Sequence, residues 1–195
     1  MTTISMDQVK VLRDQTGVSI MQCRKALEEA AGDMEKAIII LRKKGGDAAS
    51  KKADRTLGAA AVQSYIHGAG TVGAMVLLSS ETDFVSGNED FKKLAYEIAM
   101  QVAATNPEFV KTSDITPEAK KVAEEVFAKE VEGKPENMKA KILEGKVNAY
   151  FQDKVLMEQP YIKNPDLKIA NLIEAAIQKF GEKIEISKFT RFSAR

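Results

Sequence analysis

The chain has 195 residues, which is enough for one domain or two small ones with a real hydrophobic core. Charged residues make up 29% of the sequence, but the net charge is only +1 and both signs are interspersed along helix faces, so a nucleic-acid partner is not expected. A single cysteine, Cys23, excludes an intrachain disulfide and a cysteine-rich metal site.

The sequence indicates neither a membrane anchor nor a secretory signal. No apolar run approaches the roughly 20 residues that a helix needs to cross a bilayer. The first ten residues, MTTISMDQVK, contain neither the basic region nor the apolar region of a signal peptide. We therefore expect a cytoplasmic protein without a membrane partner.

Three short helices are predicted within residues 1–46. Ser5 with Gln8 has the pattern of a capping box, and Ser19 with Gln22 repeats it at the start of the second helix. The helical spacing of apolar residues predicts one buried stripe on each helix. On the second helix this stripe consists of Ile20, Cys23, Leu27 and Ala30.

The third helix is expected to end at Gly45-Gly46, because glycine is the usual stop signal of a helix. Residues 47–56, which are rich in lysine and alanine, then form a connector with some helix. From about Leu57 the pattern of the sequence changes, which places the start of a second domain there.

The second domain begins with a predicted strand hairpin. Polar and apolar residues alternate from Ala60 to Ile66, residues 67–70 form a turn, and the nearly unbroken apolar run from Val72 to Leu78 is typical of a strand buried on both faces. Far along the chain, residues 184–192 predict a third strand. The resulting sheet is small and antiparallel.

Helices occupy most of the remaining sequence. A helix over 88–104 would begin at the cap residue Asn88. Residues of about 116–157 predict a helical hairpin, with Pro117 at the first helical position, a turn at 133–135, and an apolar stripe on each helix. In the first helix of the hairpin the stripe consists of Ala119, Val122, Ala123, Val126 and Phe127, and a last helix buries residues from Ile169 to Phe180.

The order of these elements predicts an α+β fold. Residues 1–46 form an N-terminal three-helix module, residues 47–56 a connector, and residues 57–195 a core domain. The core domain contains the small antiparallel sheet, flanking helices and the helical hairpin at about 116–157.

The glycines from Gly68 to Gly73 match the dinucleotide motif G-x-G-x-x-G, but they lead into a strand rather than a helix. A hairpin turn is therefore expected instead of a phosphate site. His67 is the only histidine, and no serine stands in a nucleophile-elbow motif. We expect no catalytic residue, no metal site and no cofactor, and hence no enzyme.

The run Glu81-Thr82-Asp83-Phe84-Val85 stands where an apolar strand ends and a helix is about to begin. One interpretation is structural: Phe84 folds back into the core, and Asp83 binds nearby backbone N–H groups. The other interpretation is functional, because such a turn can present side chains to a partner while the elements on either side hold it rigid.

Two motifs carry a family resemblance. The segments ETDFVS (81–86) and LRDQTGVSIMQCRKAL (12–27) resemble the signature pair of bacterial elongation factor Ts (EF-Ts). EQPYI (158–162) and ISKFTRF (186–192) are similar to closing segments of that family, so the resemblance covers essentially the whole chain. Arg24 stands where the signature usually has lysine, and Leu77 where it usually has glutamate or glutamine.

The resemblance implies a guanine-nucleotide exchange factor for the GTPase EF-Tu in protein biosynthesis, and an N-terminal module similar to the ubiquitin-associated fold. The factor would bind EF-Tu both in its GDP-bound and in its nucleotide-free state. A single core unit resembles the short form of the family, which implies a homodimer. The alternative is a non-catalytic adaptor that uses the ubiquitin-associated-like module to hold another protein.

The resemblance also assigns contacts with EF-Tu. The resemblance implies that the residues that displace Mg²⁺ from EF-Tu are Thr82, Asp83, Phe84 and Val85. Further contacts are implied for Leu12, Arg13, Ile20 and Met21 of the first two helices, and for His67, which stands in a matching SY-x-H-G segment. Since Ile20, Cys23 and Leu27 define the inward stripe, Met21 is the residue of this set expected to be exposed.

Overall fold

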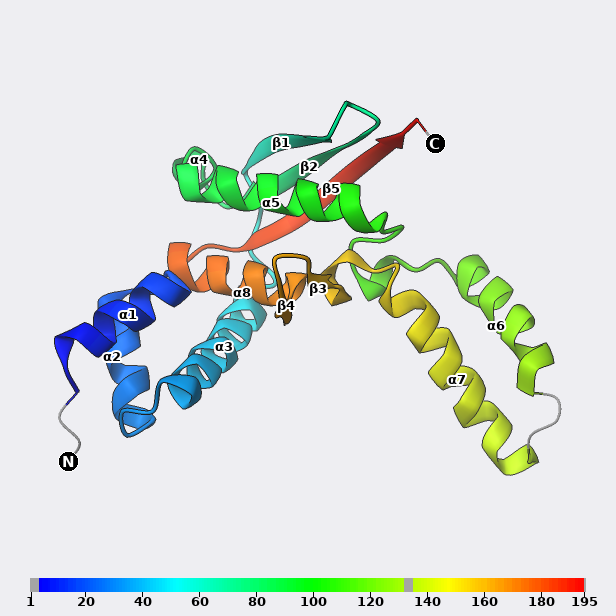
Figure 1. Cartoon of the computed structure of the whole chain (residues 1–195), viewed down its shortest axis with the longest axis horizontal. Coiled ribbons are helices and arrows are strands. Elements are labelled where there is room, and N and C mark those ends of the chain that lie inside the picture. The colour runs from blue at the N-terminus through cyan, green and yellow to red at the C-terminus, as the bar shows by residue number, and fades with distance from the viewer. Residues whose placement is uncertain (1–3, 132–134, 195) are drawn as a thin grey trace. The chain divides into compact units, whose positions relative to one another are not determined.

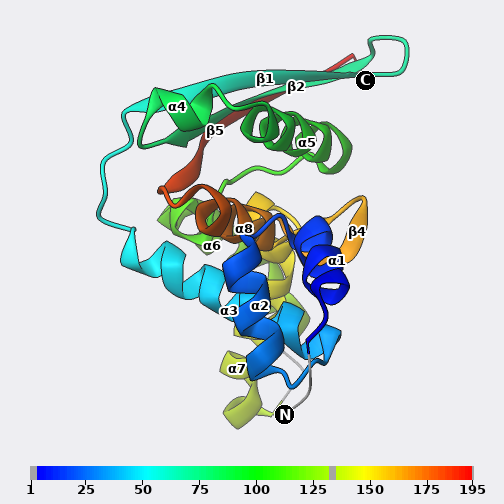
Figure 2. The same cartoon turned by 90° about the vertical axis from the view of Figure 1, so that its left-hand side faces the viewer.

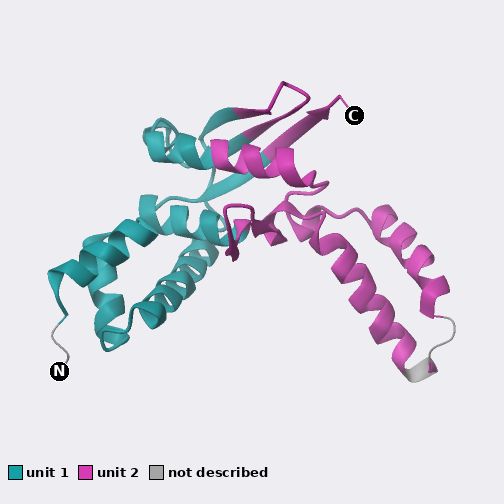
Figure 3. Cartoon of the chain, in the orientation of Figure 1, with its two compact units in different colours: residues 1–63, 77–95, 170–187 teal, residues 64–76, 96–169, 188–195 magenta. Residues whose placement is uncertain are grey.

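The computed structural model describes residues 4–131 and 135–194. Its backbone contacts divide the chain into two compact units (Figure 3). Unit 1 consists of residues 1–63, 77–95 and 170–187, and unit 2 of residues 64–76, 96–169 and 188–195. The chain therefore crosses between the units several times, and some strands and helices contribute residues to both.

Unit 1 begins with the predicted three helices, α1 (Met6–Thr16), α2 (Ile20–Glu29) and α3 (Met34–Lys51), which Figures 1 and 2 show packed together. The capping box at Ser5 and Gln8 is complete, and the Ser19 side chain accepts from the backbone of Gln22. The helices enclose a common apolar core of Val9, Leu12, Val18, Cys23, Ala26, Leu27, Ala30, Ala37 and Leu41.

The prediction that Gly45-Gly46 ends the third helix was wrong, because α3 continues to Lys51. Gly45 is buried, and a β-carbon there would lie 3.4 Å from the backbone oxygen of Glu174 and from the side chain of Gln178. Both residues belong to α8 (Ile169–Phe180). The glycine thus permits a close helix contact, and this packing outweighs its weak helix propensity.

In the described part of the chain, three strands form one sheet in the order β1-β2-β5. They are β1 (Ala59–His67), β2 (Val72–Ser80) and β5 (Ile184–Ser193). Gly68 and Gly70 have φ angles of 52° and 85° in the turn between β1 and β2, and Gly73 already belongs to β2. The predictions of an α+β fold and of a glycine-rich hairpin turn are confirmed.

Helix α5 (Glu89–Thr105) lies along one face of this sheet (Figures 1 and 2). Asn88 caps it as predicted, since its side-chain oxygen accepts from the backbone N–H of Asp90 at 2.9 Å. The apolar stripe of the helix is almost completely buried and consists of Phe91, Ala95, Ile98, Ala99 and Val102.

The predicted helical hairpin consists of α6 (Pro117–Val131) and α7 (Glu136–Gln152), which pack side by side. Of its predicted turn, Gly133 and Lys134 lie outside the described residues. The stripe predicted for α6 was too wide, because Val122 and Val126 are 61% and 56% exposed. A two-helix pair has only one partner for each helix, so it buries a narrower stripe than a helix in a larger core.

Unit 2 also contains elements that the sequence did not predict. The strands β3 (Pro160–Tyr161) and β4 (Asn164–Lys168) pair in a two-stranded antiparallel ribbon. Two short 3₁₀ helices, η1 (Thr112–Asp114) and η2 (Leu156–Glu158), precede and follow the helical hairpin in the sequence. The fully buried Gln101 fixes the ribbon, because its amide donates to Pro160 O and accepts from Ile162 N. Across residues 4–131 and 135–194, no helix is long and apolar enough to cross a membrane.

Candidate functional site

The predicted strand-to-helix turn contains a single helical turn, α4 (Asp83–Ser86), between β2 and α5. The Phe84 side chain is 84% exposed, whereas Val85 is 3% exposed. Since successive residues of a helix point about 100° apart, one helical turn can direct Phe84 outward and Val85 inward. The interpretation that Phe84 folds back into the core is therefore excluded.

The carboxylate of Asp83, next to Phe84, is also exposed. Within residues 4–131 and 135–194 it has no hydrogen-bond or ion-pair partner, so it does not bind nearby N–H groups as the structural interpretation expected. Its backbone oxygen accepts from Gly87 N at 2.8 Å, which closes the helical turn. The turn thus presents an aromatic ring and a carboxylate side by side, and Val85 anchors it from below.

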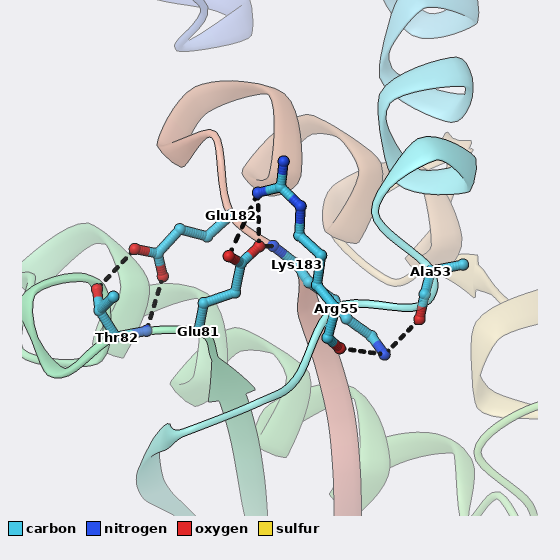
Figure 4. A network of polar contacts seen from close by, with 6 residues as sticks. All are labelled: Ala53, Arg55, Glu81, Thr82, Glu182 and Lys183. Carbon is cyan, nitrogen blue, oxygen red and sulfur yellow. Dashed lines mark hydrogen bonds and ion pairs between the residues drawn. The ribbon is translucent and has the colours of Figure 1, made fainter.

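Thr82, which precedes α4, is fixed by polar contacts on three sides. Its backbone N–H and its hydroxyl both donate to the carboxylate of Glu182, over 3.0 and 2.6 Å (Figure 4). Its carbonyl oxygen accepts from the hydroxyl of Ser80 at 2.9 Å. The direction in which the chain enters the turn is therefore determined.

Glu81 is held in a second set of contacts beside the first (Figure 4). Its carboxylate accepts from the backbone N–H of Lys183 and from the guanidinium of Arg55 at 3.1 Å. These two donors, the Lys183 N–H first, lower the pKa of Glu81. The ammonium group of Lys183 in turn donates to the carbonyl oxygens of Ala53 and Arg55, over 2.6 and 3.1 Å.

These contacts join three segments that are distant in sequence: the end of the connector, the entry to α4, and the junction between α8 and β5. The sequence predicted the turn but not its support by Arg55, Glu182 and Lys183. Glu182 stands 100 residues from Thr82, and no spacing rule relates positions so far apart. Gly181 directly follows α8, but a glycine at the end of a helix does not indicate which residue the returning chain will contact.

In the N-terminal module, the four candidate residues divide by exposure. Met21 is 64% exposed, as predicted, and Arg13 is exposed as well. Leu12 is completely buried, so its side chain supports the module rather than offering a contact. The prediction that Ile20 points inward was wrong, because it is 45% exposed and Val18 fills the core at this end of α2.

His67 is exposed at the end of β1 and belongs to unit 2, whereas the other candidate residues belong to unit 1. Its ring nitrogen Nδ1 lies 2.9 Å from the hydroxyl of Tyr65. The Tyr65 ring in turn packs edge-on against Tyr96 of α5, with 5.7 Å between the ring centroids. The imidazole is therefore oriented by a neighbour that is itself supported by a helix.

Comparison with known proteins decides the family. The family model described as elongation factor Ts matches residues 48–195. The chain belongs to the elongation factor Ts family. Its resemblance to that family, predicted from two short motifs, is thus confirmed for the core domain by the model.

Curated members of the elongation factor Ts family extend the match over the N-terminal module. The protein named elongation factor Ts from Carboxydothermus hydrogenoformans is 46% identical over 191 residues, or 97% of this chain and 88% of the relative. That of Thermotoga petrophila is 46% identical over 189 residues, or 97% of this chain and 95% of the relative. That of Desulforamulus reducens is 44% identical over 194 residues, or 98% of this chain and 89% of the relative.

Proposed function

We propose that this chain is a guanine-nucleotide exchange factor for EF-Tu that promotes GDP release during translation elongation. The observation that carries the proposal is the exposed ring of Phe84 on a fixed helical turn, in a chain of the elongation factor Ts family. Exchange of this kind displaces a bound ligand and makes or breaks no covalent bond. It requires no catalytic residue, metal ion or cofactor of the factor itself.

In the proposed mechanism, the turn acts on the Mg²⁺ site of EF-Tu. A bound Mg²⁺ neutralises phosphate charge and requires near-ideal octahedral coordination. A small displacement of its ligands therefore weakens the binding of the ion. Phe84 wedges beside this site, and Asp83 brings an exposed carboxylate. Loss of the ion then removes much of the attraction for GDP. By linkage, the factor weakens GDP binding as much as GDP weakens binding of the factor.

The N-terminal module supplies a second point of attachment to EF-Tu. Arg13, Ile20 and Met21 are the exposed members of the candidate set and would make the contacts, while Leu12 holds the module together from within. His67 is proposed as a further contact, with its ring oriented by Tyr65. Attachment at more than one point lets the factor bind before the nucleotide has left.

We also propose that the factor forms a homodimer. The parts of the sheet strands in unit 2 carry apolar side chains in solvent, with Ile66, Met75 and Phe192 exposed by 63%, 46% and 71%. Apolar side chains gathered on a sheet are typical of an interface. Light scattering coupled to size-exclusion chromatography should give twice the monomer mass, and Phe192→Asp should reduce it to the monomer mass.

The exchange proposal is tested with purified EF-Tu carrying a fluorescent GDP analogue. The wild-type chain should accelerate release of the analogue, and the double variant Asp83→Ala, Phe84→Ala should lose that acceleration while its melting temperature stays close to that of the wild type. Val126→Ala, which removes an exposed apolar side chain from α6, is the matched control and should exchange normally. A wild-type chain that binds a partner through its N-terminal module but releases no GDP would support the adaptor function instead.

A further inference from the structure

The helix that carries Phe84, α4, is only one turn long. A helix of one turn is not stable by itself, because forming it fixes several residues for very few hydrogen bonds. Thr82 is the N-cap residue of α4, yet its side chain does not cap the helix. Instead, both of its donors are directed to Glu182. The start of the turn is therefore ordered from outside rather than by its own cap.

Glu182 reaches the turn because the chain changes direction at the end of α8. Gly181 ends α8 with a φ angle of 74°, in the left-handed region that favours glycine, and its N–H donates to Ile177 O. The chain then leaves the helix so that the next two side chains diverge (Figure 4). Glu182 contacts Thr82, and Lys183 contacts the connector at Ala53 and Arg55.

Phe84 is oriented mainly by the residues on either side of it. The ring is almost fully exposed, so it receives little packing support. Its direction depends on the buried Val85 and Ser86 after it and on Thr82 before it. The two hydrogen bonds from Thr82 to a carboxylate are charge-assisted, which makes them stronger than ordinary ones. Glu182 therefore supplies the charged contact at the start of the turn, where the side chains of Thr82 and Asp83 are both exposed.

We propose that Glu182 is a positioning residue for nucleotide exchange. It holds Thr82 so that α4 is folded, with Phe84 outward, before the factor meets EF-Tu. This inference rests on the proposed function and adds to it a residue outside the family's turn motif. Without the carboxylate, the turn is folded in only a fraction of the molecules. The apparent affinity for the partner then falls to that same fraction of its original value.

The test separates binding from the release step. The rate of GDP release is measured against the concentration of the factor, which gives a half-saturating concentration and a maximal rate. Glu182→Ala should raise the half-saturating concentration about five- to tenfold and change the maximal rate by no more than about twofold, because the wedge is present but ordered only part of the time. Phe84→Ala removes the wedge and should lower the maximal rate.

Asp90→Asn is the matched control. Asp90, at the start of α5, pairs with Lys179 of α8 at 2.7 Å, so it also links the region after the turn to the end of α8. Its carboxylate accepts from Lys179, whereas the donors of Thr82 are directed to Glu182. If Glu182 acted only by joining these elements, Asp90→Asn would have the same effect as Glu182→Ala. We expect its half-saturating concentration to equal that of the wild type, and an equal rise in both variants would overturn the proposal.

Two more variants give graded outcomes. Glu182→Gln keeps one oxygen that can accept from the Thr82 N–H but loses the charge, so it should recover only part of the affinity. Thr82→Val removes the hydroxyl half of the contact and leaves Glu182 intact, so it should raise the half-saturating concentration about two- to threefold. This variant also provides the test if Glu182→Ala fails to fold. An unchanged half-saturating concentration in folded Glu182→Ala, or in Thr82→Val where the former does not fold, would overturn the proposal.

Amide hydrogen exchange gives a readout that is independent of EF-Tu. The N–H groups of Ser86 and Gly87 donate to the carbonyl oxygens of Thr82 and Asp83, over 3.2 and 2.8 Å. In Glu182→Ala they should exchange faster, while protection of α8 and α5 stays unchanged. The two failures are distinguishable: a wild-type chain without exchange activity contradicts the proposed function, whereas an active wild type with an unaffected Glu182→Ala contradicts only the positioning role.

Discussion

The turn around Phe84 and the α6–α7 hairpin both expose apolar side chains, but they are ordered in different ways. In the turn, the side-chain contacts reach far along the chain, to residues 26 and 102 positions from Glu81 and 100 positions from Thr82. In the hairpin, two consecutive helices pack against each other around Ala123, Val147 and Phe151. The turn therefore requires the rest of unit 1 to be folded, whereas the hairpin requires mainly its own two helices.

The polar contacts of the hairpin differ from those of the turn as well. Lys146 and Glu130 form an ion pair at 2.6 Å between side chains that are 41% and 50% exposed. Such surface pairs contribute little to stability, because water and salt screen them. In the turn, by contrast, carboxylates accept from backbone N–H groups as well as from side chains. A single exposed ring thus depends on hydrogen bonds that fix the backbone beside it, whereas an exposed helix face does not.

The largest difference between the two regions is expected for buried phenylalanines. Phe91 follows the turn, is completely buried, and packs edge-on against Phe180 with 6.1 Å between centroids. Phe91→Ala should cost about 3–5 kcal/mol of unfolding free energy. Phe127 of the hairpin is only partly buried, so Phe127→Ala should cost about 1–2 kcal/mol. Urea denaturation followed by circular dichroism measures both, and equal losses would show that the two regions do not differ in packing.

A glycine beside the turn provides the next test. A β-carbon at Gly58 would lie 2.8 Å from the backbone oxygen of Glu81, and the Gly58 N–H donates to Ser80 O at 3.1 Å. Both atoms in the close contact belong to the backbone or are fixed to it, so Gly58→Ala forces a shift at the entry to the turn. We expect a loss of about 1–3 kcal/mol in thermal denaturation, together with slower GDP release. If Gly58→Ala lowers stability but leaves the rate of GDP release unchanged, the contact between Gly58 and Glu81 does not influence the turn.

The hairpin contains a glycine whose replacement by alanine should raise stability rather than lower it. Gly145 lies within α7, and a β-carbon there would meet no atom within 4 Å. Gly145→Ala should therefore raise the unfolding free energy by about 1 kcal/mol, because alanine has the higher helix propensity and nothing is displaced. The same thermal denaturation that measures Gly58→Ala checks this. A loss of stability at Gly145 would mean that the hairpin face is packed more closely than the structure shows.

Sequence patterns predicted the features that depend on neighbouring residues. The three helices of the module, the strand hairpin and the cap at Asn88 follow from local periodicity and turn residues, and the structure contains them. The errors concern residues whose environment is set by distant elements. Gly45 continues a helix because α8 packs against it, and Ile20 is exposed because Val18 takes its place in the core.

The candidate site shows the same division. Its location could be predicted, because a strand end, a cap and a family motif coincide at residues 81–86. Whether Phe84 pointed in or out could not, because both interpretations fit the same residues. The support from Arg55, Glu182 and Lys183 could not be predicted either, since it depends on how the chain returns after about a hundred residues.

The smallest effects are expected from pH, and they run in opposite directions in the two regions. The pKa of Glu81 is lowered by the Lys183 N–H and by Arg55, so its contribution to stability is full above its unfolded pKa of about 4.3 and is lost as the pH falls through the folded value. The pKa of Lys154, at the end of the hairpin, is raised by Glu108 and Tyr150. Its contribution is full below about pH 10.4 and is lost as the pH rises through the folded value.

Thermal denaturation of the wild type, Glu81→Gln and Lys154→Met over the pH range tests this contrast. The gap between wild type and Glu81→Gln should close on the acid side and stay constant at alkaline pH, because Arg55 keeps its charge and the Lys183 contact is made by a backbone N–H. The gap between wild type and Lys154→Met should close on the alkaline side instead. A Glu81 gap that persists in acid would show that its hydrogen bonds to Lys183 and Arg55 do not require the ionised carboxylate, and the support of the turn would then depend on shape rather than on charge.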